Sequence, residues 1–131
     1  MTDAERARFD ALVEEAIGSL PPPLRELLEE APVIVDDRPS PEMLRSMGLP
    51  SGEPLCGLHT GVALTERSVE HSGVPTDVIH LFREGIVRAA GGWRQPDADD
   101  AVYDEIEITL LHEIGHHFGL DEDDLEALGY G

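Results

Sequence analysis

Long apolar runs, cysteine pairs and basic residues are missing or scarce in this sequence. No stretch approaches the roughly 18 apolar residues that a membrane-spanning helix needs, and the single cysteine, Cys56, excludes an intrachain disulfide. Residues 1–6 lack the basic start and the apolar core of a signal peptide. Because disulfides are typical of oxidising compartments, these absences predict a cytoplasmic protein that does not cross a membrane.

The shortage of positive charge limits the partners that the protein can bind. The chain has 9 Lys and Arg residues against 28 Asp and Glu residues, which gives a formal net charge of -19. Phosphate groups would be repelled, so we expect no nucleic-acid partner and no binding to anionic membranes. The acidic residues most simply form a solvated surface. Mimicry of nucleic acid is the more specific alternative.

In other respects the composition is ordinary for a globular protein. Hydrophobic residues make up 40% of the 131 residues, and the mean hydropathy is -0.21. This is sufficient for a modest core, so we expect a single domain over residues 1–131, most simply a monomer. The sequence has no internal repeat, no G-x-G-x-x-G motif and no P-loop.

The most informative stretch is residues 112–120, which contains the motif H-E-x-x-H. On a helix, His112 and His116 share one face, with Cβ atoms about 5–6 Å apart, and both imidazoles can therefore bind one zinc ion. Glu113 lies beside that ion without needing to be a ligand. A glutamate at this position acts as the general base that takes a proton from a metal-bound water. We therefore predict His112 and His116 as metal ligands and Glu113 as the catalytic residue.

The residues before and through this motif have the pattern of a helix. Asp97, Asp99 and Asp100 lie at or before its expected start, where negative charge is favourable. Gly119 supplies its end, because glycine accepts the left-handed conformation of a C-cap. Apolar residues recur at every fourth position, and these are Val102, Ile106, Leu110, Ile114 and Phe118.

The third metal ligand is expected either just past Gly119 or upstream of the motif. The extended spacing H-E-x-x-H-x-x-G-x-x-Z places a ligand at Glu122, which is the first choice. Asp121 and Asp123 remain alternatives, since a one-residue change in the turn would exchange them with Glu122.

Two further histidines are weaker candidates. His117 points about 100° away from His116 around the helix, which favours a packing or supporting role. His59 lies in a predicted strand, where a lone histidine is usually structural. If His59 or Asp121 were a fourth protein ligand, the metal site would be structural and not catalytic.

The remaining sequence predicts short helices and strands. Their order gives an α+β domain, with a small sheet of about three strands packed against helices and the motif on a C-terminal helix. The third strand either ends at Arg83 or continues past Gly85 to Arg88. The expected helices are residues 2–19, 24–30, 41–47, 97–118 and 123–128, and the strands are residues 33–35, 57–64 and 78–83, with an extension to 88 left open.

The chain resembles the small bacterial zincin-like metallopeptidases, also described as minimal metalloproteases. The similarity runs through most of the chain and is most specific at residues 112–130. It implies a compact zincin-like fold, bound zinc and the motif H-E-x-x-H-x-x-G-x-x-D. By this resemblance His112 and His116 match the histidine ligands, Glu113 the catalytic acid and Gly119 the turn glycine.

The sequence departs from the family pattern at three positions. Glu122 stands where the family usually has aspartate, and a glutamate is longer by one methylene. His59 stands where tyrosine is common, and Gly85 where proline is common. The first departure affects the third ligand, and the other two lie outside the motif.

Our leading hypothesis is a zinc-dependent metallopeptidase that hydrolyses a peptide or protein substrate through a metal-activated water, with Glu113 as general base. We expect the substrate to lie extended along an edge strand. One alternative is a metal-stabilised binding module without turnover. The other is an acidic nucleic-acid mimic without a metal.

Overall fold

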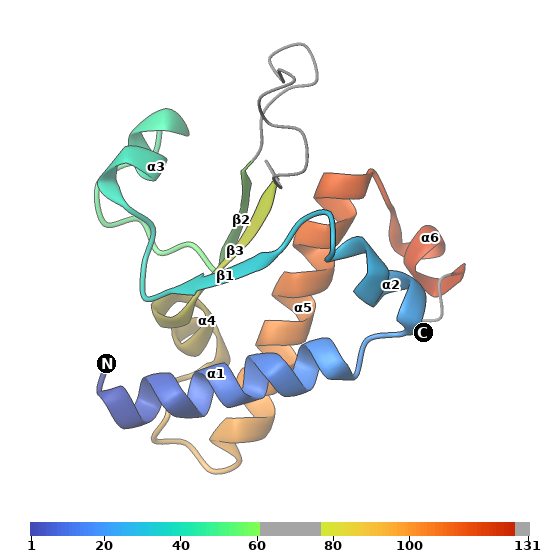
Figure 1. Cartoon of the computed structure of the whole chain (residues 1–131). Helices are drawn as coiled ribbons and strands as arrows, with labels where there is room; N and C mark the ends of the chain where they lie inside the picture. Colours follow the sequence, from blue (N-terminus) through green and yellow to red (C-terminus); the bar gives the residue numbers. More distant parts are fainter. Residues whose placement is uncertain (61–76, 128–131) are drawn as a thin grey trace.

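The computed structural model describes residues 1–60 and 77–127, apart from the side chains of Glu122, Leu125 and Glu126. The described residues form helices around a three-stranded sheet (Figure 1), so the predicted α+β class is confirmed. None of the described helices is long and apolar enough to cross a bilayer. The elements are α1 (Asp3–Gly18), α2 (Pro22–Leu27), β1 (Val33–Asp36), α3 (Pro41–Ser46), β2 (Gly57–Thr60), β3 (Val78–Phe82), α4 (Arg83–Ala90), α5 (Ala98–Phe118) and α6 (Glu122–Ala127).

β3 is the central strand of the sheet, in which the strand order is β1-β3-β2. β1 pairs with β3 in parallel and β2 pairs with it antiparallel, so that Val33 and His59 both lie opposite Ile79. Side chains alternate along a strand, and Ile79 and Leu81 therefore point to the same face, where both are fully buried. Within the described residues, β1 and β2 form the two edges of the sheet.

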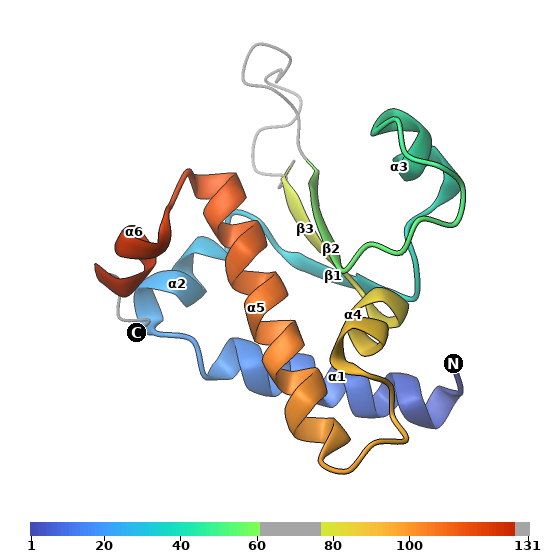
Figure 2. The ribbon, with the colours of Figure 1, turned by 180° about the vertical axis from the view of Figure 1, so that it is seen from behind.

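The buried face of the sheet packs against α1 and α5. Figures 1 and 2 show α5 running along one side of the sheet, with α1 crossing it. α5 contributes to two core clusters and so connects the two halves of the domain. The first cluster includes Phe9, Val13, Leu81, Ile86, Val102 and Ile106. The second includes Leu20, Leu24, Ile79, Leu110 and Ile114.

The helix predicted around the motif is confirmed as α5. Asp99 and Asp100 occupy its first turn, and Gly119 ends it in the left-handed conformation with a φ of 66°. The predicted apolar stripe of α5 faces the core. The residues of the stripe that belong to the two core clusters have no exposed surface. These fully buried residues are Val102, Ile106, Leu110 and Ile114.

Most other predicted elements are found with small shifts at their ends. The hydroxyl of Thr2 accepts a hydrogen bond from the Glu5 N–H at 3.1 Å, and the Glu5 carboxylate accepts one from the Thr2 N–H at 2.9 Å, as in a capping box. The second helix begins earlier than predicted, at Pro22, since proline suits the first turn of a helix. The predicted strand 57–64 is described only as far as Thr60, and its remaining residues lie outside the described ranges.

The possible extension of the third strand through residue 88 is wrong, because a helix, α4, begins at Arg83. Ile86 and Val87 favour a strand by their β-branched side chains, but both are buried in the core from one face of the helix. Gly85 is at the point where α4 passes the backbone of Leu55. Tertiary packing therefore overrides the local preference of these residues.

The contact between Gly85 and Leu55 gives a test of this packing. A Cβ atom at Gly85 would lie well inside van der Waals contact of the Leu55 carbonyl group, which belongs to the backbone and cannot rotate away. We expect Gly85→Ala to lower the free energy of unfolding by about 1–3 kcal/mol, as measured by urea denaturation. Gly18→Ala is the matched control, because no atom lies within 4 Å of a Cβ there. An equal effect of both substitutions would contradict this account.

A second constraint on the start of α4 is an ionic network at Arg83. Its guanidinium donates to the Asp10 carboxylate at 2.9 Å and to the Asp37 carboxylate at 3.0 Å. Arg6 of α1 also donates to Asp37 at 3.0 Å. The hydrogen bond from Arg6, followed by that from Arg83, holds the pKa of Asp37 below its usual value.

This network predicts an acid-dependent stability. A carboxylate with a lowered folded-state pKa stabilises the fold fully above its unfolded-state pKa of about 3.9, and this contribution is lost as the pH falls through the folded-state pKa. We expect Asp37→Asn to be less stable than wild type at pH 7 and the difference to shrink below about pH 4. Denaturation curves between pH 3 and 7 measure it. The exposed neighbour Asp36 provides the control substitution Asp36→Asn, and a difference that is independent of pH would contradict the assignment.

Candidate metal centre

The motif residues lie together near the C-terminal end of α5. The imidazole rings of His112 and His116 have centroids 4.2 Å apart. Both histidines are exposed, whereas Glu113 is buried, with 7% of its surface exposed. One donor atom from each of the three residues lies within 4.8 Å of the other two. Two exposed imidazoles beside a buried carboxylate can bind a divalent cation and accept a proton next to it.

Glu113 is buried because β2 passes close to α5. A Cβ atom at Gly57 would lie 2.7 Å from Cγ2 of Thr109 and 3.1 Å from Cγ of Glu113, so the approach depends on glycine. Burial raises the pKa of Glu113, and the nearby His112 and His116 act in the opposite direction. A carboxylate with a raised pKa is a stronger base than an exposed one.

The chain turns back directly after the motif. The Leu120 N–H donates to the Gly115 carbonyl at 2.9 Å, which places the following residues beside the end of α5. α6 then begins, and Asp121 precedes it as a cap. Its carboxylate accepts the Asp124 N–H at 2.8 Å, and the Asp124 carboxylate accepts the Asp121 N–H at 3.0 Å.

The three acidic candidates for a third ligand differ in their surroundings. Asp121 and Asp123 are exposed. Among the described residues, neither of them forms a compact group of donor atoms with His112 and His116. Glu122 is the first residue of α6, and its side chain lies outside the described residues. The carboxylate of Asp121 is engaged in capping α6, so the spacing of the motif continues to favour Glu122.

A sequence model of the zincin-like metallopeptidase family matches residues 28–131, which is most of the chain. The chain belongs to this family. No curated protein sequence matches it. Membership of the zincin-like family identifies the protein as a metallopeptidase at the level of the family and implies a metal, typically zinc.

The side chains of this zincin-like domain fit such a metal. Imidazole nitrogens are ligands that suit zinc, and the two histidines present them on the exposed side of α5. An exposed pair leaves space around the ion for water and substrate, as a catalytic site requires. The buried carboxylate of Glu113 lies on the side that faces β2.

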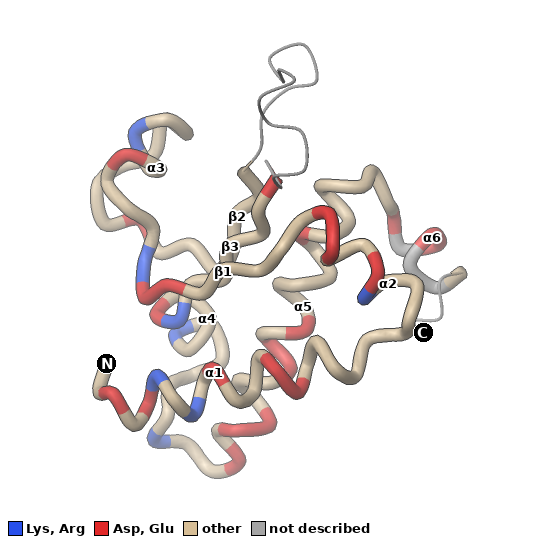
Figure 3. The backbone as a smooth tube through the Cα atoms, in the orientation of Figure 1, with Lys and Arg blue, Asp and Glu red and all other residues tan. Residues whose placement is uncertain are grey.

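The charge of the zincin-like domain also favours cations at this end of α5. Figure 3 shows that, in the part of the chain that the structure describes, the basic residues lie on α1 to α4 and the loops next to them, with none on α5, β2 or β3. Near the two histidines the acidic residues are Glu113 and, just after the helix, Asp121, Asp123 and Asp124, whereas the other acidic residues of α5 lie at positions 99–107. Concentrated negative charge raises the local concentration of divalent cations.

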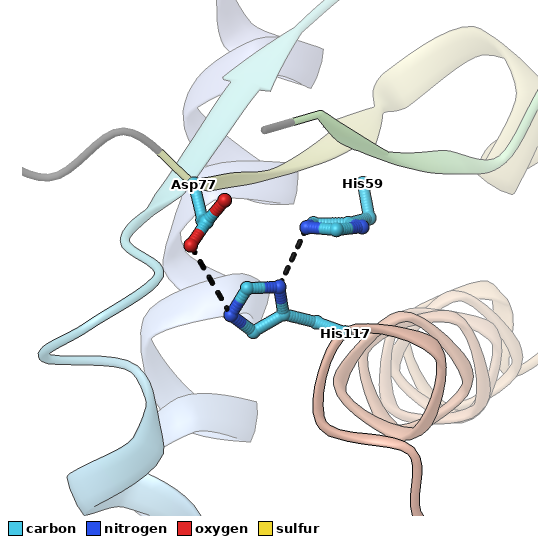
Figure 4. Close-up of side chains that lie close together, drawn as sticks. All are labelled: His59, Asp77 and His117. Atoms are coloured by element: carbon cyan, nitrogen blue, oxygen red, sulfur yellow. Dashed lines mark hydrogen bonds and ion pairs between the residues drawn. The ribbon is translucent and has the colours of Figure 1, made fainter. Parts of the chain in front are cut away.

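His117 and His59, expected to have separate structural roles, lie together (Figure 4). Nδ1 of His117 is 2.6 Å from Nε2 of His59. On its other side, Nε2 of His117 is 3.7 Å from a carboxylate oxygen of Asp77. Asp77 was not a candidate from the sequence, because no motif marks it. Its position directly before the strongest strand pattern was the only signal that the sequence contained.

The zincin-like domain also has a cleft of about 370 Å³ between α3 and α4. Its lining includes three prolines and the ion pair between Arg38 and Glu84 at 2.8 Å. None of the motif residues lines it. This cleft contains no set of ligands or nucleophiles among the described residues, so it is not part of the candidate centre.

Proposed function

We propose that this zincin-like domain is a zinc-dependent peptidase that hydrolyses peptide bonds with Glu113 as general base. The observation that supports this proposal is the arrangement of two exposed imidazoles and one buried carboxylate, with donor atoms within 4.8 Å of one another, on one helix. The match to the zincin-like metallopeptidase family over residues 28–131 supports the class of reaction.

His112 and His116 would hold the zinc ion, with Glu122 as the third ligand. When bound, zinc supplies Lewis-acid polarisation of the scissile carbonyl and a water that is acidic enough to act as a nucleophile near neutral pH. Glu113 takes up the proton of this water and returns it to the leaving amine. The burial of Glu113 favours the uptake, because it raises the pKa of the carboxyl group.

β2 is the element of the sheet that we propose binds the substrate. It is an edge strand within the described residues, and it runs beside the part of α5 that carries Glu113. An extended peptide can add to such an edge through main-chain hydrogen bonds. The net charge of -19 favours neutral or basic peptides over acidic ones.

The role of Glu113 is tested by Glu113→Gln, which removes the base and keeps the shape of the side chain. We expect kcat to fall about 10²–10⁴-fold on a fluorogenic peptide library, with zinc content unchanged by elemental analysis. Glu105→Gln, the same substitution two helical turns earlier on α5, is the control and should keep full activity. Turnover that survives Glu113→Gln would remove Glu113 from the mechanism. Zinc binding by a wild-type protein that hydrolyses no peptide would favour the binding module.

The third ligand is tested by replacing each of the three acidic candidates with alanine in separate variants. We expect Glu122→Ala to weaken zinc binding by more than the roughly 10–100-fold that loss of a supporting residue causes. Asp121→Ala should affect mainly the start of α6, which it caps, and Asp123→Ala should have little effect. Competition with a chromogenic chelator measures the affinities. A large loss in Asp121→Ala or Asp123→Ala instead would move the ligand to that position.

A further inference from the structure

We propose that His59, Asp77 and His117 form a second binding site for a divalent transition-metal ion, distinct from the motif site. The three residues come from three parts of the chain, namely β2, the residue before β3, and the end of α5. Figure 4 shows the His117 ring lying between the other two side chains, with one nitrogen toward His59 and the other toward Asp77. This inference does not depend on the peptidase activity.

The pairing of β2 with β3 places His59 and Asp77 on the same face of the sheet. His59 lies directly opposite Ile79, and residues opposite each other point to the same face. Asp77 is two residues before Ile79, so its side chain points to that face too. The carboxylate and the imidazole are thus diagonal neighbours across the strand pair, on the side that packs against α5.

The packing of α5 along β2 then brings His117 to this pair. Gly57 lies against Glu113. Four helical residues rise about 6 Å, and two strand residues span about 6.6–6.8 Å. The distance along α5 from Glu113 to His117 therefore matches the distance along β2 from Gly57 to His59. The meeting of the two histidines follows from the register between the helix and the strand.

The donor atoms are close enough to share one ion. One donor atom from each residue lies within 4.8 Å of the other two. The contacts of 2.6 Å to His59 and 3.7 Å to Asp77 use opposite nitrogens of His117, so His117 would bind the ion through one of these nitrogens. The side chains of His117 and Asp77 are only 11% and 13% exposed. The site is thus largely enclosed.

The chemistry of this cluster selects the class of ion. Two imidazoles and one carboxylate suit zinc and related first-row metals, whereas calcium and magnesium prefer oxygen ligands alone. We therefore assign zinc as the ion and predict that it crosslinks β2 and β3 to the end of α5.

The two sites are separated by the geometry of the helix. His116 and His117 are adjacent in sequence, but their side chains point about 100° apart around α5. His116 is exposed with His112, while His117 faces the sheet and contacts His59. One ion cannot be shared by both pairs in these orientations, so each site is expected to bind an ion of its own. The two ions would repel each other, because His59 already interacts electrostatically with His116 and Glu113.

The experiment is a titration of the full chain, stripped by chelator, with cobalt(II) as a spectroscopic substitute for zinc. We expect the wild-type protein to bind two equivalents of cobalt. The double variant His112→Ala/His116→Ala should keep one equivalent, with the visible absorption of a low-symmetry site. His59→Phe should keep the equivalent that binds at His112 and His116. The triple variant His59→Phe/His112→Ala/His116→Ala should bind none. His80→Gln is the control and should leave both equivalents intact, because His80 is a buried histidine on the opposite face of β3 that bonds Thr60.

Circular dichroism confirms folding of each variant, and Asp77→Asn replaces His59→Phe if that variant does not fold. The proposal is overturned if the folded double variant His112→Ala/His116→Ala binds no cobalt at millimolar concentration. It is also overturned if His59→Phe and Asp77→Asn both retain two equivalents. If the double variant loses nothing and His59→Phe loses all binding, the second site stands and the proposed peptidase centre fails.

Discussion

The contact between β2 and α5 at Gly57 determines how the rest of the candidate centre is arranged. Because glycine has no side chain, the strand approaches the helix until Cγ of Glu113 would lie 3.1 Å from a Cβ atom at that position. This contact buries Glu113 and leaves His112 and His116 exposed on the adjacent face of the helix. It also fixes the register that brings His59 to His117. One close approach thus buries the base beside the exposed ligands and aligns His59 with His117.

The sequence was sufficient to predict the elements whose pattern is local. α5 has an apolar residue at every fourth position, acidic residues in its first turn and a glycine at its end, and each of these signals is found in the structure. The capping box of α1 is equally local. α4 was missed because Ile86 and Val87 favour a strand by themselves, and only the contacts that they make in the folded core favour the helix.

The residues of the candidate site also fall into those that a local sequence pattern predicts and those that depend on contacts between distant parts of the chain. The spacing of H-E-x-x-H identifies His112, Glu113 and His116, because helix geometry alone brings them together. Asp77 could not be found from the sequence, since its contact with His117 depends on the pairing of β2 with β3 and on the packing of α5. The burial of Glu113 likewise depends on Gly57, which is 56 positions away in the chain. Non-local contacts therefore account for what sequence patterns could not provide.

Within the described residues β2 lies at an edge of the sheet, and this position has a consequence for the behaviour of the protein at high concentration. An edge with free main-chain groups can pair with the same edge of another molecule as readily as with a peptide. The net charge of -19 on each chain opposes such an encounter. Since the range of this repulsion falls from about 10 Å at 0.1 M salt to about 3 Å at 1 M, concentrated salt should promote self-association through β2.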